Sequence, residues 1–348
     1  MAPTEPTDRP GPAKASGRRP GGGAPAPSRP LAGTAVHGVL LVDKPSGPTS
    51  HDVVHRVRRA LGTRDAGHTG TLDPAATGLL AICLGDALKL QRWLADGDKT
   101  YLATVAFGAS TTTEDAEGTV LQRGDPSGLT EAALRAALPA LTGEIDQVPP
   151  MYSAVRVDGR RLHQAARAGE MVERAPRRVT VHALELTGLE PVGADGLRLA
   201  HLVVRCGKGT FVRTLAADLG RSLGVPAHLA ALRRTATGPF RLEDALPLEA
   251  LEQLAAGDRA ALLARIVRPA EAVAFFPLAA VDANGAIALS RGRQLARPGV
   301  ADGFCRVVGP DGALVAVGEV KDGRLRPVRV ITAPLLGPGP GVTRPDPA

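Results

Sequence analysis

The stretch GVLLVDKPSGPTSHDVVHRVRRALG (residues 38–62) sets the fold class of the chain. Its first part is a short apolar run stopped by a proline turn, which predicts a buried strand. Its second part has Ser50 as a candidate N-cap, apolar residues at helical spacing and Gly62 as a stop signal, which predicts an amphipathic helix. We therefore expect ordered structure to begin at about His37 with a strand and then a helix.

The same mixture continues along the chain. Strand patterns cover 100–111, 179–190 and 197–209, helix patterns cover 130–143 and 210–224, and 78–94 has the pattern of a buried strand followed by a helix. Because strands and helices do not alternate strictly, the pattern favours an α+β fold over a doubly wound sheet.

The C-terminal part has a different pattern. A short helical or turn segment is predicted over 288–295, and 304–331 predicts three strands joined by Asp-Gly turns at 311–312 and 322–323. We expect a catalytic domain over 37–268 and a small β-rich domain over 269–335. Residues 1–36, with eight Pro and six Gly, and residues 336–348 are expected to be flexible tails.

Composition narrows the class of protein. The chain of 348 residues has 44% hydrophobic residues, a net charge of +7 and no apolar run long enough to span a membrane. No apolar signal core begins the sequence, so we expect a cytoplasmic protein. Cys83, Cys206 and Cys305 are far apart and lack metal-ligand spacing, which argues against a disulfide scaffold or a metal site.

The most unusual polar stretch is GHTGTLDPAATG (67–78). Asp73 is its only carboxylate and is a candidate nucleophile or acid/base. The structural alternative is a helix N-cap followed by a proline at the first helical position. His68 in the same stretch is a hydrogen-bonded structural residue or a functional one.

Two further motifs carry candidate side chains. In CGKGTFVRT (206–214), Lys208 could hold an RNA phosphate, although the spacing is not that of a Walker A loop. Arg213 is either a surface charge or a buried partner of a carboxylate such as Asp73. In DKTY (98–101), Tyr101 either packs in a strand or stacks on a single base, since 3% aromatic residues exclude a broad stacking platform.

Basic residues suggest RNA as a partner. Between Arg205 and Arg234 there are six Lys or Arg and one acid, and Arg156–Arg178 is also basic. Such runs are either solvated faces or an RNA-binding face.

In order along 37–240, six motifs resemble the bacterial TruB-type tRNA pseudouridine-55 synthases. They are GVLLVDKPSGPTSHDVV, AGHTGTLDPAATGLLAICLGDALKL, DKTYLATVAFG, VPPMYSAVRVDGRRLHQAARAGE, CGKGTFVRTLAADLG and HLAALRRTATGPF. The resemblance implies a mixed, mainly antiparallel sheet flanked by helices, with a PUA-like C-terminal domain. It also implies isomerisation of a uridine in the tRNA T-loop, by a monomer without cofactor, metal or obligate protein partner.

The resemblance also assigns roles. Asp73 corresponds to the catalytic aspartate, Tyr101 to the active-site tyrosine and Arg213 to the arginine that pairs with the aspartate. The implied substrate-binding residues are His68, Lys44, Lys208, Phe211 and Leu232. Phe211 stands where many relatives have Tyr, Arg156 replaces a more usual Lys and His163 a more usual Tyr.

The chemistry leaves alternatives open. Asp73 could attack ribose C1′, attack uracil C6 or remove a proton, and a nearby cation is expected to lower its pKa. The rival functions are a non-catalytic RNA-binding or RNA-folding protein, a glycosidase and a guide-RNA-dependent synthase. A retaining glycosidase needs a second carboxylate that the 67–78 stretch does not offer.

Overall fold

The computed structural model describes residues 36–153, 155–157, 160–162, 170, 172–297 and 300–331. The predicted tails, apart from Val36, and His163 lie outside these residues. No helix within them is both long and apolar enough to cross a membrane.

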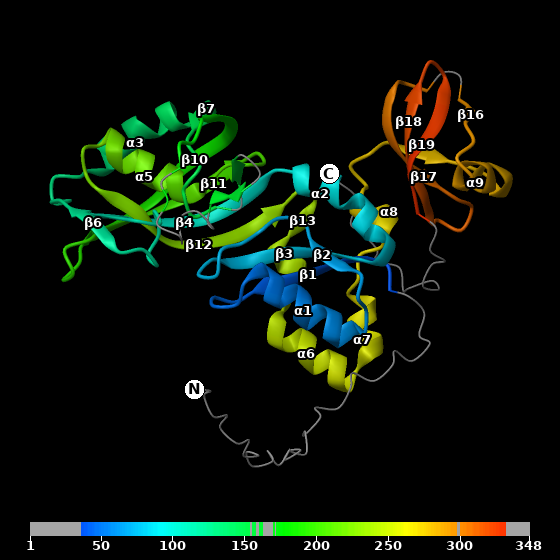
Figure 1. Cartoon of the computed structure of the whole chain (residues 1–348), viewed down its shortest axis with the longest axis horizontal. Helices are drawn as coiled ribbons and strands as arrows, with labels where there is room; N and C mark the ends of the chain where they lie inside the picture. The colour runs from blue at the N-terminus through cyan, green and yellow to red at the C-terminus, as the bar shows by residue number, and fades with distance from the viewer. Residues whose placement is uncertain are drawn as a thin grey trace, which may run out of the picture. The chain divides into compact units, whose positions relative to one another are not determined.

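A large mixed sheet forms the centre of the described structure (Figure 1). Its strands, in spatial order, are β14 (Leu246–Pro247), β1 (Gly38–Lys44), β3 (Thr77–Leu84), β12 (Ala227–Thr237), β4 (Lys99–Phe107), β11 (Arg198–Cys206), β10 (Arg177–Val192) and β7 (Gly143–Gln147), with β2 (Ala66–His68) on β3 and β13 (Phe240–Arg241) on β12. Among the described residues, the pairs are antiparallel except β1 with β14 and β12 with β3. The predicted α+β class and mainly antiparallel sheet are confirmed.

Helices pack against two halves of this sheet. The helical segments are α1 (Ser50–Leu61), η1 (Gly85–Leu90), α2 (Gln91–Asp96), α3 (Glu131–Ala137), η2 (Leu138–Leu141), α5 (Val212–Ser222), η3 (Leu242–Asp244), α6 (Leu248–Gly257), α7 (Arg259–Ala264), α8 (Pro269–Ala272) and α9 (Ala283–Ser290). Figure 1 shows α1 and α6 by β1 and β3, and α3 and α5 by β10 and β11. Each group shares a hydrophobic core with its half of the sheet.

Helix α1 begins one residue earlier than its predicted cap implies. The N-cap is Thr49, whose hydroxyl accepts from the Asp52 backbone N–H, while the Asp52 carboxylate accepts from the Thr49 N–H. This capping box satisfies two N–H groups that a helix start leaves open. Ser50 is the first helical residue, and its hydroxyl instead bonds the N–H and C=O of Leu72 at 2.8 and 2.9 Å. The start of α1 is thereby tied to the polar stretch around Asp73.

No helix begins at Asp73, so the N-cap alternative for this residue is wrong. The chain from Thr71 to Ala76 is a loop with one turn, closed by a hydrogen bond from the Ala76 N–H to the Asp73 carbonyl. It then enters β3. Asp73 is thus carried by a loop at the edge of two central strands, β3 and β12.

A second sheet forms the C-terminal part. Its order is β15 (Leu278–Ala280), β17 (Gly303–Val308), β18 (Leu314–Lys321), β19 (Arg324–Val330) and β16 (Leu295–Ala296). Both Asp-Gly turns occur where predicted, with left-handed backbone at Gly312 and at Asp322 and Gly323. The helix expected over 288–295 begins earlier, at the Asp282 cap, and ends at Ser290. Two small hairpins complete the described elements: β5 (Ala109–Thr111) with β6 (Val120–Arg123), and β8 (Arg156–Val157) with β9 (Arg160–Arg161).

Candidate active site

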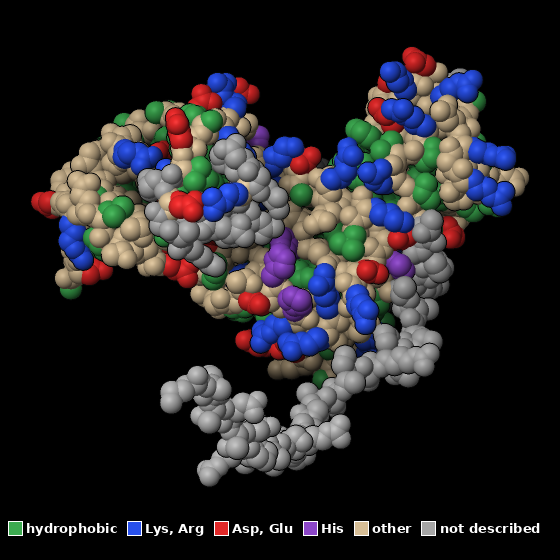
Figure 2. All heavy atoms as spheres, viewed as in Figure 1, with side chains coloured by type: hydrophobic (Ala, Val, Ile, Leu, Met, Phe, Trp, Pro, Cys, Tyr) green, Lys and Arg blue, Asp and Glu red, His purple; other side chains and the backbone are tan. Residues whose placement is uncertain are grey.

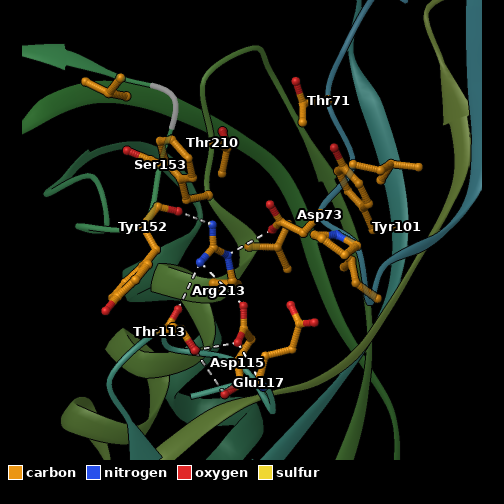
Figure 3. Close-up of a pocket in the computed structure, with 16 residues that line it drawn as sticks. Thr71, Asp73, Tyr101, Thr113, Asp115, Glu117, Tyr152, Ser153, Thr210 and Arg213 are labelled. Carbon is orange, nitrogen blue, oxygen red and sulfur yellow. Dashed lines mark hydrogen bonds and ion pairs between the residues drawn. The ribbon is translucent and has the colours of Figure 1, made fainter. Parts of the chain in front are cut away.

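A cavity of about 690 Å³ opens where β4, β12, the Asp73 loop and the start of α5 meet (Figure 3). Five of the residues singled out by the sequence line it: Asp73, Tyr101, Phe211, Arg213 and Leu232. They come from four separate segments of the chain, so the fold brings them together.

Asp73 and Arg213 form an ion pair in this cavity. The distance from Arg213 Nε to Asp73 Oδ2 is 3.0 Å. The Arg213 side chain is 7% exposed, whereas that of Asp73 is 40% exposed and faces the cavity. The alternative that Arg213 is a surface charge is therefore wrong. The carboxylate keeps an open side toward any molecule that enters.

The guanidinium of Arg213 is held on all sides. Its Nη1 donates to the Thr113 carbonyl at 2.9 Å and lies 3.4 Å from Asp115 Oδ2, and its Nη2 donates to the Tyr152 carbonyl at 2.9 Å. Figure 3 shows these contacts converging on Arg213 from opposite sides. A buried arginine with a partner at each of its three guanidinium nitrogens fixes the direction in which its Nε faces Asp73.

The net pKa shift of Asp73 is upward, although Arg213 lowers this pKa as expected of a nearby cation. Burial raises the pKa of this carboxyl, and the charge of Asp115 adds to the rise. The charges of Arg213 and Lys44 oppose it without reversing it. Desolvation of the Asp73 carboxyl therefore outweighs its ion pair with Arg213.

Tyr101 and Leu232 form one wall of the cavity. Tyr101 lies on β4 and is 8% exposed, and burial raises the pKa of its phenol. Leu232 lies on the neighbouring strand β12, paired with Ala103. Phe211 is the N-cap residue of α5, and its backbone N–H and C=O bond the side-chain amide of Gln147 at 2.8 and 3.1 Å. Phe211 also lines the cavity, and its side chain carries no hydroxyl.

Lys44 is fully buried behind the Asp73 loop. Its ammonium donates to the carbonyls of Pro45, Pro74 and Ala76 at 2.9, 2.9 and 2.7 Å. Burial lowers its pKa to about 8. Lys44 therefore shapes the loop and does not line the cavity.

His68 and Lys208 also lie outside the cavity lining. His68 is on β2, half-buried, with its ring 5.6 Å from that of His51 on α1. Lys208 is exposed and pairs with Asp96 at 3.0 Å. Within the described residues, neither His68 nor Lys208 forms a hydrogen bond or ion pair with Asp73, Tyr101 or Arg213.

The sequence reasoning missed an acidic loop beside the cavity. Asp115 shares Arg213 with Asp73, and Glu117 also lines the cavity. Glu114 has a left-handed backbone, with φ at 63°, and its carboxylate accepts a 2.6 Å hydrogen bond from Thr214 on α5. The signal that could have found this loop is TEDAEG (113–118), three acids in a turn that follows a strand.

Metal-ligating groups are not gathered in the described ranges. No cluster of three His, Cys, Asp or Glu side chains there could hold a metal ion. Cys83, Cys206 and Cys305 are separate, buried free thiols.

Comparison with solved structures identifies the class of fold. A Cbf5–Nop10–Gar1 complex contains a chain that superposes with a TM-score of 0.65 at 26% identity, covering 88% of this chain and 91% of that one. An archaeal box H/ACA Nop10–Cbf5 complex gives 0.64 at 25% identity, covering 88% of both chains. The fold is that of the pseudouridine synthases.

Sequence comparison is more specific. Residues 58–212 match the family model described as the TruB family pseudouridylate synthase N-terminal domain, and 213–274 and 276–332 match two C-terminal models of tRNA pseudouridine synthases. The tRNA pseudouridine synthase B of Aromatoleum aromaticum is 50% identical over 299 residues, which covers 85% of this chain and 93% of the relative. That of Stutzerimonas stutzeri is 44% identical, with 85% and 96% covered. The chain belongs to the TruB family of pseudouridylate synthases.

Proposed function

We propose that this protein converts the uridine at position 55, in the T-loop of tRNA, into pseudouridine, with Asp73 as nucleophile or base and without a cofactor. The observation that carries the proposal is the Asp73–Arg213 ion pair at an open cavity walled by Tyr101 and Leu232. One half-exposed carboxylate, oriented by a buried guanidinium, is the group that such chemistry needs.

The reaction is an isomerisation, so its atoms balance without a second substrate. The N1–C1′ bond breaks, the uracil turns, and C5 bonds to C1′. C5 then loses its proton and N1 gains one, so the number of protons is unchanged. Asp73 acts at the reacting base or sugar, and Arg213 keeps the carboxylate oriented. Tyr101 stacks on the base, and Leu232 packs against it.

Access to the uridine requires that it leave the T-loop stack. Flipping a nucleotide costs a few kcal/mol, and stacking on an aromatic ring returns about 1–3 kcal/mol. Figure 2 shows Lys and Arg side chains spread over the viewed face, with histidines grouped near its centre. The net charge of +7 supports attraction to RNA phosphates, and therefore salt-dependent binding. We propose a cytoplasmic monomer that needs no protein partner.

A hydrolase remains the second candidate, because the cavity holds more than one carboxylate. Asp115 shares Arg213 with Asp73, which removes the argument that only one carboxylate is available. The two functions differ in product: hydrolysis releases free uracil, whereas isomerisation retains the base on the RNA.

The test is pseudouridine mapping on an unmodified tRNA transcript without added cofactor. Wild-type protein should convert the T-loop uridine, and Asp73→Ala should abolish conversion while tRNA affinity stays within about tenfold. Asp96→Ala, at an exposed aspartate paired with Lys208, is the matched control and should convert normally. Near-normal turnover by Asp73→Ala would refute the role of Asp73, and tight binding without conversion by wild type would indicate an RNA-folding protein.

A further inference from the structure

Arg234 is the largest side chain among those that are fully buried, and it is charged. It lies on β12, next to Arg233 in sequence. Arg233 is 40% exposed and pairs with Asp43 through two bonds of 3.1 and 2.7 Å. Within the described residues, no carboxylate forms an ion pair with Arg234. Two adjacent arginines therefore have opposite environments.

The guanidinium of Arg234 binds backbone carbonyls on both sides of Asp73. Its Nε donates to Leu79 at 2.7 Å, its Nη2 to Gly70 at 3.0 Å and its Nη1 to Thr71 at 3.4 Å. Gly70 precedes the Asp73 loop, Thr71 begins it and Leu79 follows it. The planar fork of donors thus joins the two stems of the loop that carries Asp73.

Arg234 also faces Tyr101. The two residues are Cα partners across β12 and β4. Burial raises the pKa of the Tyr101 phenol, while the nearby guanidinium of Arg234 opposes the rise. One side chain therefore bonds to the chain on both sides of Asp73 and comes from the direct partner of Tyr101 on the neighbouring strand.

Backbone packing around Arg234 is close. A Cβ added at Gly78, where φ is +99°, would lie 2.3 Å from the Arg234 carbonyl oxygen. The strands at this point, Gly78 on β3 and Arg234 on β12, are direct partners. The backbone of Arg234 is therefore packed closely against β3, while its guanidinium is held by the three carbonyls.

A buried cation without a carboxylate partner is costly to desolvate. An apolar side chain would fill the same space at lower cost but could not donate to the three carbonyls on both sides of Asp73. The cost of burying Arg234 therefore favours a role in holding the Asp73 loop in place over a role in filling space in the core.

We propose that Arg234 is a positioning residue that holds the Asp73 loop and Tyr101 in one relative geometry, so that carboxylate and aromatic ring meet the flipped uridine together. The proposal rests on the proposed function of the same cavity. Arg234 itself touches neither substrate nor reacting atoms.

The first test does not depend on activity. The chain has only two tyrosines, Tyr101 and Tyr152, so ¹³Cζ-tyrosine labelling gives two NMR signals. Replacing Arg234 with Lys or Gln should move the Tyr101 signal and leave that of Tyr152 in place. Arg233→Lys, the matched control, should move neither. An unmoved Tyr101 signal in Arg234→Lys would overturn the proposal.

The second test is kinetic. In single turnover on tRNA transcript, Arg234→Lys should lower the rate at least tenfold with tRNA affinity within threefold, whereas Arg233→Lys should stay within twofold. Combined with Tyr101→Phe, the loss should be smaller than the product of the two single losses, since both changes act through the same residue, Tyr101. Multiplicative losses would overturn the proposal, as would variants at Arg234 that all fail to fold. Absence of conversion by wild type would instead refute the proposed function.

Discussion

Lys44 offers a test of how the site is built, because its charge is buried where an apolar residue would be expected. The side chain is fully buried at the end of β1, and burial lowers its pKa from 10.5 to about 8. In the unfolded chain the amine keeps its proton up to about pH 10.5. We expect Lys44→Met to change how stability depends on pH, in a direction that the pKa values fix.

Between pH 8 and 10.5 the unfolded chain binds more protons at Lys44 than the folded protein does. The contribution of Lys44 to the free energy of unfolding therefore rises with pH through this range. The difference between the folded pKa of about 8 and the unfolded pKa of 10.5 corresponds to about 3 kcal/mol of unfolding free energy over the whole pH range. Of this, about 1 kcal/mol falls between pH 7 and pH 9, by the linkage relation.

The assay is guanidinium chloride unfolding at pH 7 and pH 9 on three proteins. From pH 7 to pH 9, the wild type should gain about 1 kcal/mol relative to Lys44→Met. Lys208→Met, at an exposed lysine, is the control and should follow the wild type. If all three proteins show the same change with pH, the buried ammonium of Lys44 is not the titrating group and the reasoning fails.

Two further perturbations address the cavity. Tyr101→Phe should keep tRNA affinity but slow single-turnover conversion; an unchanged rate would leave the ring with a stacking role alone. Asp115→Asn should move the acid limb of the rate–pH profile to lower pH, because the Asp115 charge raises the pKa of Asp73 and the active carboxylate is lost as pH falls through that pKa. An unchanged limb, or one at higher pH, in stopped-time assays across pH 4–7 would contradict this coupling.

The spacing of apolar residues was sufficient to predict the helices and strands that carry an apolar face. The helix over α1 was predictable because Val53, Val57 and Leu61 recur at helical spacing and are all buried. The Asp73–Arg213 pair was a different matter. Local pattern left Arg213 as either a surface charge or a buried partner of a carboxylate such as Asp73, and the resemblance to a family was needed to assign this pair, whose residues are 140 positions apart.

Charge patterns were the least reliable guide. The run from Arg205 to Arg234 was interpreted as a solvated or RNA-binding face, yet Arg213 and Arg234 are buried. A count of charges does not contain the direction in which each side chain points. The role of Asp115 was equally out of reach, since it depends on the left-handed backbone of Glu114 and on the bridge between Asp115 and Leu229 on β12.

The absence of a helix start at Asp73-Pro74, the alternative that local pattern offered, has a physical reason in two buried cations, Lys44 and Arg234. Lys44 takes the carbonyls of Pro74 and Ala76, and Arg234 takes those of Gly70, Thr71 and Leu79. A helix would have satisfied its carbonyls within its own turns. Here side chains from β1 and β12 satisfy them instead, so the loop can hold an open form with Asp73 facing the cavity. The Asp73 loop thus depends on long-range partners, and a local propensity could not have specified it.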